Sequence, residues 1–231
     1  PEELCTFLGL KKVPPTEPFP REIWGTVICA LVSCYNGDAE RGAQVMKPIR
    51  DSLPRPLIDG VAPMPFPALQ AMFDPLLPKG LQWYWKCDFV RELPDEAIEA
   101  HLAHAKQMPG ELSLMHLYPI DGAVHRVAPD ETAWRFRDAT WSMVIAGIDG
   151  NPGRAGELKE WGRAYWEAVH PFAAGGGYVN FMMGDEGQDR IRATYGANYE
   201  RLAAIKAKYD PGNLFRVNQN IVAAPESQMR H

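Results

Sequence analysis

Gly175-Gly176-Gly177-Tyr178-Val179-Asn180-Phe181 opens the stretch that decides how this 231-residue chain is organised. The three glycines allow the backbone to turn tightly or to approach a flat partner closely. Tyr178 to Phe181 is β-prone and predicts a short strand, whose side chains alternate between two faces. Tyr178 and Asn180 share one face in this prediction, which sets an aromatic group beside an amide.

A long helix is predicted after this strand. Its apolar and aromatic residues recur every three to four positions and form a stripe that must pack against another part of the protein: Ile191, Tyr195, Tyr199, Leu202, Ile205 and Tyr209. Asp210-Pro211-Gly212-Asn213 is a turn sequence and ends the helix near Tyr209. An extended segment then runs to Ile221 and carries three consecutive side-chain amides, on Asn218, Gln219 and Asn220.

The same stretch holds three ordered motifs: Tyr178-Val179-Asn180-Phe181, Tyr195-Gly196-x-Asn198-Tyr199-x-Arg201-Leu202, and Lys208-Tyr209-Asp210-Pro211-x-Asn213-Leu214-Phe215-Arg216-x-Asn218-Gln219-x-Ile221. Together they resemble the C-terminus of the berberine-bridge-enzyme-like, FAD-linked oxidoreductases. Earlier segments resemble the same family in the same order, among them Cys34-Tyr35-x-Gly37-Asp38, Pro63-Met64-Pro65, Tyr84-Trp85-Lys86 and Gly122-Ala123-Val124-x-Arg126. The resemblance covers nearly the whole chain, but only the back half of the family.

The resemblance implies a protein of two parts. In the family, an N-terminal domain binds FAD and often attaches it through His and Cys, and a second domain lays a sheet over the flavin as the substrate wall. This sequence has no Gly-rich phosphate loop, and it starts at Pro1. We therefore expect a fragment, a processed half or one chain of a split protein, with FAD bound mostly by a domain absent from this chain.

Strand and helix patterns alternate irregularly along the chain and predict an α+β fold, with a mostly antiparallel sheet flanked by helices. The β-prone runs are 24–35, 82–90, 113–118, 122–126 and 140–148, and the helical runs are 39–53, 68–73, 95–108 and 157–172. Residues 1–23 are rich in Pro, Lys and Glu and predict a linker or an edge arm. We expect a substrate-binding domain at 1–175, a flavin-contacting segment at 176–222 that returns to the missing FAD domain, and a tail at 223–231.

In two of the predicted helices, the spacing of apolar residues indicates which side chains are buried. In 157–172, Leu158, Trp161, Tyr165 and Val169 share one face. In 95–108, the pattern predicts Ile98, Leu102 and Ala105 inward. His101 and His104 on the same helix are spaced as metal ligands can be, but an exposed helix face is the simpler interpretation.

The charge and composition of the chain argue against some classes of function. The formal net charge of −5 and the pI near 5.7 argue against a surface for nucleic acid or anionic membrane. No apolar run approaches the length of a membrane span. The four cysteines show no metal-binding spacing, and Cys29 and Cys34, five apart in a predicted strand, face opposite sides. The simplest interpretation is that the cysteines are reduced thiols in a cytoplasmic protein and bind no metal.

The resemblance also implies where a catalytic base stands, because the flavin takes the hydride and the protein supplies the base that takes the accompanying proton. The corresponding positions here are Tyr118, Met143 and Phe181. Two of these are apolar, so we expect Met143 and Phe181 to line a substrate pocket, and Tyr118, or Lys86 on the aromatic strand 82–90, to act catalytically. Either base requires a lowered pKa. A buried structural tyrosine and a salt-bridged lysine remain the alternatives.

Flavin contacts are implied at Tyr178 and Asn180, and the amides of Asn218 and Gln219 suit the polar edge of a flavin or cap the chain end. We expect these four residues and Tyr118 to meet on one face. Three functions stay open. The chain is the substrate half of an FAD-dependent oxidase with an apolar substrate and oxygen as acceptor, a flavin-free ligand-binding module, or an interaction subunit that joins an FAD-binding domain in cis or trans. The sequence is also compatible with a homo-oligomer.

Overall fold

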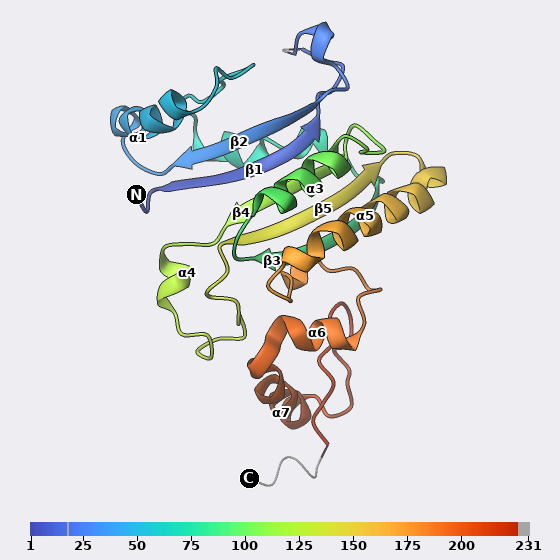
Figure 1. Ribbon diagram of the computed structural model, residues 1–231. Coiled ribbons are helices and arrows are strands. Elements are labelled where there is room, and N and C mark those ends of the chain that lie inside the picture. Colours follow the sequence, from blue (N-terminus) through green and yellow to red (C-terminus); the bar gives the residue numbers. More distant parts are fainter. Residues whose placement is uncertain (18, 226–231) are drawn as a thin grey trace.

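A five-stranded antiparallel sheet forms the centre of the computed structural model, which describes residues 1–17 and 19–225 (Figure 1). The strand order is β2-β1-β4-β5-β3. The strands are β1 (Leu4–Lys12), β2 (Val27–Tyr35), β3 (Gln82–Val90), β4 (Leu114–Pro119) and β5 (Trp141–Asp149). The helices are α1 (Ala39–Ser52), α2 (Phe66–Ala71), α3 (Asp95–Ala105), α4 (Ala123–Arg126), α5 (Ala155–Val169), α6 (Gln188–Tyr195) and α7 (Tyr199–Tyr209). The α+β class and the antiparallel sheet are confirmed.

Helices α3 and α5 cover one face of the sheet (Figure 1). The largest core cluster lies between them and the strands, and it includes Leu117, Met143, Ile145, Trp161 and Tyr165. The predicted inward stripe of α5 is confirmed, since all four of its members are buried. Burying each such side chain contributes about 1.5 to 3 kcal/mol to folding.

The predicted inward face of α3 is confirmed at Ala105 and wrong at Ile98 and Leu102. Ala97, His101 and Ala105 are buried, whereas Ile98 and Leu102 are each 43% exposed. The small alanines let α3 approach α5 closely, and His101 Nδ1 lies 2.9 Å from the hydroxyl of Tyr165 on that helix. A buried polar group requires such a partner. His101 is therefore a core residue, and the exposed helix face expected for it is also wrong.

The N-terminal residues are part of the sheet rather than a linker. β1 pairs with β2 along its full length and with β4 from Leu8 to Lys11, so it is an interior strand. β2 forms one edge of the sheet. Leu8 and Leu10 point to the helix-covered face because alternate residues of a strand share a face. This alternation outweighs the prolines that follow at Pro14 and Pro15.

Two predicted strands are absent from the described residues. Residues 122–126 begin at Gly122 with a φ of 57° and form the short helix α4. Residues 179–181 form a 3-10 turn, η5 (Val179–Phe181). The predicted long C-terminal helix is broken in two at Gly196, whose φ of 51° interrupts helical geometry.

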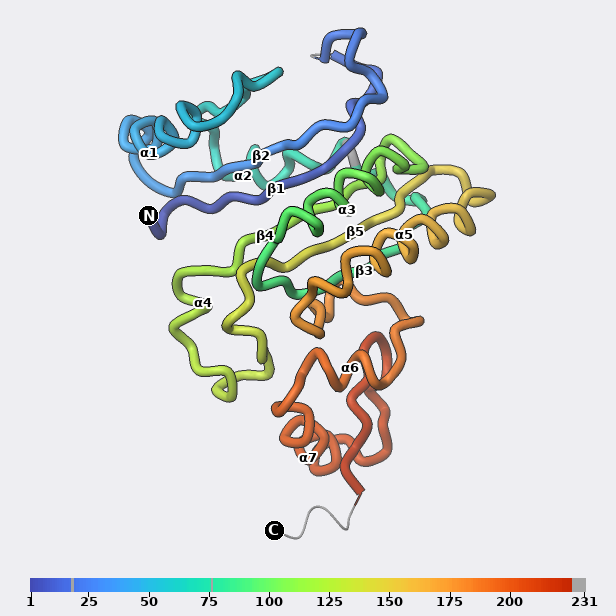
Figure 2. The backbone as a smooth tube through the Cα atoms, in the orientation of Figure 1, coloured from blue at the N-terminus to red at the C-terminus, as the bar shows by residue number. Residues whose placement is uncertain are grey.

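The C-terminal segment lies beyond the β3 edge of the sheet, with α6 next to β3 and α7 farther out (Figure 2). α1 lies at the opposite edge, beside β2 (Figure 2). No helix within 1–17 and 19–225 has the length and apolar character needed to cross a bilayer.

Candidate active site

Tyr118 lies on the sheet face opposite α3 and α5. In β4, Met115 and Leu117 enter the core, so His116 and Tyr118 project to the other side. The Tyr118 ring stacks on Phe181 of η5, with centroids 5.8 Å apart and an interplanar angle of 28°. Tyr118 is therefore positioned between the sheet and the C-terminal segment.

Further aromatic rings extend this surface. Phe7 of β1 lies 5.1 Å from the Tyr118 ring centroid. On the other side, Trp85 of β3 stacks on Phe181 at 5.6 Å and 12°, and Trp83 stacks on Trp85 at 5.0 Å and 12°. We call these five residues the aromatic face. All five are partly exposed, so the face can receive a flat ligand.

Tyr178 and Asn180 lie at one end of the aromatic face. The Tyr178 ring meets Phe181 edge-on at 5.1 Å. The Asn180 amide donates a hydrogen bond of 2.6 Å to the Tyr178 hydroxyl. The 3-10 turn therefore brings these side chains together, although they do not lie on a strand.

The chain end returns to the same turn. Gln219 donates hydrogen bonds to the carbonyl groups of Met182 and Met183, at 3.0 and 3.2 Å. Asn218 is exposed and has a φ of 60°, a left-handed conformation that asparagine tolerates. Of the two predicted amides, the structure brings Gln219 beside η5 and leaves Asn218 at the surface.

Lys86, a predicted catalytic residue, and Met143, a predicted pocket residue, lie on the other side of the sheet from Tyr118. The β3–β5 register pairs Lys86 with Ile145, and the β4–β5 register pairs Leu117 with Met143. Paired residues point to the same side of a sheet, so both side chains face α5 rather than the aromatic face. Met143 is 1% exposed in the core, and Lys86 is held by a buried ion pair with Glu186.

His116 is a polar neighbour of Tyr118 that the sequence analysis missed. Its Nδ1 lies 2.8 Å from the Tyr118 hydroxyl. Gly9 on β1 leaves room for the ring, since a Cβ there would come within 2.9 Å of His116 Cδ2. The spacing His116-x-Tyr118 in a strand was the signal that could have identified the pair.

Burial sets the protonation of both groups. It lowers the pKa of His116 to about 4, with a smaller contribution from the positive charge of Lys11. Burial also raises the pKa of Tyr118 above its ordinary value, which is the opposite of the shift that the sequence analysis required of a catalytic base. At neutral pH the imidazole is therefore neutral and the phenol keeps its proton.

Buried charges attach the C-terminal segment to β3. Lys86 pairs with Glu186 at 2.9 Å. Asp88, which is fully buried, pairs with Arg190 of α6 and accepts from His170 Nδ1 at 2.9 Å. Arg190 also donates to the carbonyl group of Cys87 at 2.6 Å. These bonds fix the position of η5 relative to the sheet.

Gly176 and Gly177, just before η5, allow the backbone to pass close to strand β3. The Phe89 amide donates to the Gly176 carbonyl at 2.7 Å. A Cβ at Gly176 would lie 2.3 Å from Phe136, and one at Gly177 would lie 2.6 Å from the sulfur of Cys87. Only glycine fits where this segment crosses β3.

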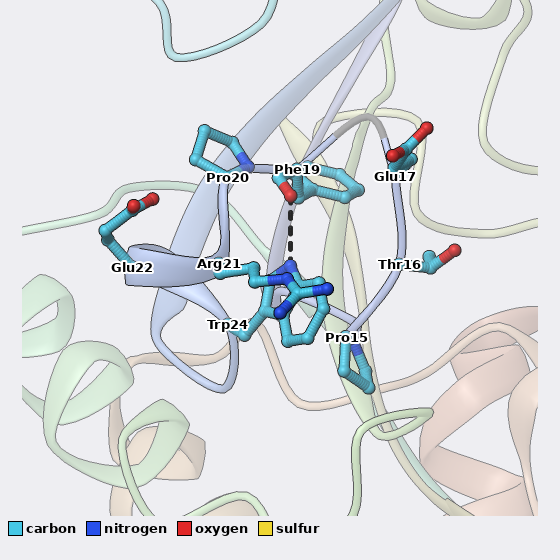
Figure 3. Close-up of a pocket in the computed structure, with 8 residues that line it drawn as sticks. All are labelled: Pro15, Thr16, Glu17, Phe19, Pro20, Arg21, Glu22 and Trp24. Carbon is cyan, nitrogen blue, oxygen red and sulfur yellow. Dashed lines mark hydrogen bonds between the residues drawn. The ribbon is translucent and has the colours of Figure 1, made fainter.

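Two cavities lie apart from the aromatic face. One, of about 500 Å³, lies between β2, α1 and residues 60–72, and its lining includes Cys34, Met46 and Arg50. The other, of about 700 Å³, is an open hollow in the loop 15–24 (Figure 3). There the Trp24 indole donates to the Phe19 carbonyl at 3.0 Å. No group of three or more potential metal ligands occurs in the described part of the chain.

Comparison with known proteins gives a consistent result. The family model for "Berberine and berberine like" matches residues 177–222, the segment that returns to the aromatic face. An FAD-linked oxidoreductase of Dictyostelium discoideum is 26% identical over 199 residues, covering 85% of this chain and 42% of that protein. A monolignol oxidoreductase of Arabidopsis thaliana is 27% identical over 150 residues, covering 59% of this chain and 28% of that protein.

Solved structures show the same fold. The Arabidopsis thaliana protein BBE-like #28 superposes with a TM-score of 0.79 at 19% identity, over 97% of this chain and 51% of that one. Berberine bridge enzyme from Eschscholzia californica gives 0.75 at 20% identity, over 96% of this chain and 49% of that one. This chain thus spans about half the length, or less, of the proteins it matches. The chain is therefore similar in sequence to FAD-linked oxidoreductases, and its fold is that of berberine-bridge-enzyme-like proteins.

Proposed function

We propose that this chain supplies the substrate-facing part of an FAD-dependent oxidoreductase that oxidises an organic substrate. The observation that supports it best is the meeting of Tyr118, Phe181 and Tyr178 on one partly exposed face. That face adjoins the segment matched by the family model. FAD, when bound, supplies the acceptor for the substrate hydride, and oxygen is the proposed acceptor that reoxidises it.

The residues of the C-terminal segment fit a flavin. Tyr178 and Phe181 offer flat apolar contact to a ring system. Asn180 uses one amide hydrogen on Tyr178, and Gln219 uses its amide nitrogen on two backbone carbonyls. Their amide oxygens remain as acceptors for polar groups at the edge of the ring, and Asn218 is an exposed amide next to them. Tyr178, Asn180, Asn218 and Gln219 are the proposed flavin contacts, and Phe181 lies beside them.

The substrate is proposed to have a flat, largely apolar body. Four of the five residues of the aromatic face carry no charge or hydroxyl, and stacking on such rings contributes about 0.5 to 1.5 kcal/mol per pair beyond area burial. Tyr118 supplies the polar group beside them. Lys86 has no part in this proposal, because its ammonium group is committed to Glu186 on the other side of the sheet.

A flavin-binding domain, in cis or in trans, is part of the proposal. Large apolar side chains are exposed along the segment that follows α1 and near the chain end, which is unusual for a surface that faces only water: Leu53, Leu57, Ile58, Val61, Met64, Phe66, Leu214, Phe215 and Val217. A second domain that covers these residues would explain their exposure. The assignment of 1–175 to substrate and 176–222 to flavin belongs to this same proposal.

A flavin-free ligand-binding module is the second candidate, and the 500 Å³ cavity beside β2 favours it. Its size suits a small organic ligand. The four free thiols suit a reducing compartment, so a cytoplasmic location is part of either proposal.

The test is to purify the protein expressed from its complete gene and record its absorption spectrum. We expect the spectrum to show the absorption bands of flavin. Under anaerobic conditions, an oxidisable aromatic alcohol such as 2-naphthylmethanol should bleach these bands. Tyr118→Phe should slow bleaching at least about a hundredfold if Tyr118 takes part in proton transfer. A colourless protein that binds no added FAD would refute the proposal and leave the second candidate.

A further inference from the structure

Cys5 and Cys34 form a pair of thiols on neighbouring strands. They lie directly opposite each other in the register of β1 and β2, and both are free. The amide of Asn36 donates to the carbonyl group of Glu3 at 2.8 Å, so these two residues are a hydrogen-bonded pair of the same ladder. Such pairs recur at every second residue, so Cys5 and Cys34 are also one, with Cα atoms about 5.5 Å apart. This separation lies within the range that a disulfide requires.

The side chains of the pair can meet after a small movement. Paired residues point to the same side of a sheet, and their Cβ atoms are about 4.5 to 5.5 Å apart, so closing the bond requires a shift of about 1 Å. Cys5 is the second residue of β1, and Cys34 is the last but one of β2. The pair therefore lies where both strands end, and a shift there disturbs little of the ladder.

The pair also continues the aromatic face. Cys5 and Phe7 are two apart on β1, so their side chains lie on the same side of the strand, about 7 Å apart. Phe7 packs against Tyr118, and Tyr118 stacks on Phe181. Phe181 in turn meets Tyr178, one of the proposed flavin contacts. The two thiols and the proposed flavin contacts thus lie at opposite ends of one surface.

The surroundings of the four cysteines differ. Cys5 is exposed, and Cys34 lines the 500 Å³ cavity beside β2, so small molecules can reach both. Cys87 is 1% exposed, and burial raises the pKa of its thiol to about 12, so it stays protonated and unreactive at neutral pH. Cys29 lies opposite Leu10 rather than opposite another cysteine. Only Cys5 and Cys34 combine access with a facing thiol.

We propose that Cys5 and Cys34 are a reversible oxidation site, which hydrogen peroxide converts to a disulfide. Oxygen that takes two electrons and two protons from a reduced flavin leaves as hydrogen peroxide. The source of the oxidant therefore rests on the proposed function, whereas the facing thiols rest on the strand register alone.

The reaction has two steps. The sulfur of Cys5, the more exposed thiol, attacks one oxygen of hydrogen peroxide, the O–O bond breaks, and a sulfenic acid and one water form. The sulfur of Cys34 then attacks the sulfur of Cys5, the S–O bond breaks, and a second water leaves. The two thiols together lose two electrons and two protons, which the peroxide gains. A thiol such as glutathione restores both cysteines by exchange.

The disulfide should tie the edge strand to its neighbour. Local opening of β2 requires its separation from β1, and a covalent bond near the end of the ladder opposes this separation. We expect the backbone amides of 27–35 to exchange with solvent at least about tenfold more slowly after oxidation. Equal exchange before and after oxidation would show that the bond has no such effect.

The first measurement treats the protein expressed from its complete gene with about ten equivalents of hydrogen peroxide. Peptide mapping should find a Cys5–Cys34 disulfide, and dithiothreitol should restore both thiols. Cys34→Ser should leave Cys5 as a sulfenic acid, with at least about tenfold more labelling by dimedone than in the wild type, because capture within the molecule is lost. Cys29→Ser, on the same strand, is the control and should form the disulfide as the wild type does.

Three results would overturn the inference. These are survival of both thiols, sulfinic acid at Cys5 without a disulfide, and a disulfide that joins two protein molecules instead. The measurement requires no flavin, because the peroxide is added. Its result therefore stands apart from the presence or absence of flavin bands in the spectrum.

The second measurement links the site to the proposed reaction. Flavin-loaded protein is given 2-naphthylmethanol either in air or without oxygen, and the disulfide is then mapped. We expect the Cys5–Cys34 bond in air and two free thiols without oxygen. A protein that binds no FAD, yet forms the bond with added peroxide, would refute the proposed function alone. Turnover in air with both thiols intact would contradict the link between this site and the reaction.

Discussion

Lys86 on β3 and Glu186, just before α6, form an ion pair of 2.9 Å in which both side chains are 5% exposed or less. The pair joins the centre of the sheet to the segment that carries the aromatic face. Removing either charge takes the nearest counter-ion from the other, although Glu186 also has Arg190 at 3.8 Å, and breaking a buried pair costs about 3 to 5 kcal/mol. The position of η5 therefore depends on charges on the opposite side of β3.

Lys86→Met should lower the free energy of unfolding by about 3 kcal/mol or more, measured by urea denaturation. The double variant Lys86→Met with Glu186→Leu should be less destabilised than either single variant, because it leaves no isolated buried charge. Lys47→Met is the control, since the Lys47–Asp51 pair is well exposed and should contribute less than about 1 kcal/mol. Equal losses for Lys86→Met and Lys47→Met would show that the buried pair has no special role.

Gly177→Ala should destabilise the C-terminal segment. Its new Cβ would lie 2.6 Å from the sulfur and 3.0 Å from the backbone oxygen of Cys87, so the segment must move away from β3. We expect a loss of about 1 to 3 kcal/mol and faster amide hydrogen exchange in α6. Gly184→Ala, in the same segment, meets nothing within 4 Å and should leave both quantities nearly unchanged. A variant at Gly177 that matched this control would argue against close packing there.

Stability should fall as the pH falls from about 6.5 to about 4. Burial lowers the pKa of His101 to about 4 in the folded protein, with a smaller contribution from His104, whereas the unfolded value is near 6.5. The unfolded chain therefore binds more protons in this window, and folding loses up to about 3 kcal/mol across it from His101 alone. His101→Gln should flatten the pH dependence of the urea midpoint. An unchanged slope in this variant would locate the acid sensitivity elsewhere.

Cys5 and Cys34 face each other across the β1–β2 pair. Directly opposite residues on antiparallel strands have Cβ atoms about 4.5 to 5.5 Å apart, slightly more than a disulfide requires. A thiol oxidant such as diamide should therefore link these two cysteines with a small shift of the edge strand, and peptide mapping would identify the bond. Cys29 is the control, because it lies opposite Leu10. Recovery of all thiols in reduced form after oxidation would contradict the prediction.

The parts of the fold that the sequence predicts are those with one dominant local signal. β3 and β5 are long apolar or aromatic runs, and the α5 stripe has regular spacing, so these three elements were predicted correctly. β1 was missed because prolines and charges around it outweighed a short alternation. The turn at η5 was missed because four β-prone residues follow glycines whose close packing on Cys87 and Phe136 cannot be read locally.

The candidate site was predicted in part, for a reason that lies in the sheet register. Tyr118 and Phe181 are far apart in sequence, yet the structure stacks them, and Gln219 returns to the same turn. Lys86 and Met143 were grouped with them, but the side of a sheet that a residue faces depends on its pairing and on which face the helices cover. His116 was overlooked because a histidine in a strand gives no signal until its neighbours are known.

Rapid-reaction measurement of flavin reduction tests the central claim most directly. The flavin-loaded protein from the complete gene is mixed anaerobically with 2-naphthylmethanol, and wild type is compared with Tyr118→Phe and with Tyr84→Phe, whose hydroxyl bonds Asp185 on the side of the sheet that α5 covers. The account predicts reduction by the wild type and by Tyr84→Phe at similar rates, and a rate at least about a hundredfold lower in Tyr118→Phe. Reduction of Tyr118→Phe at the wild-type rate would contradict it.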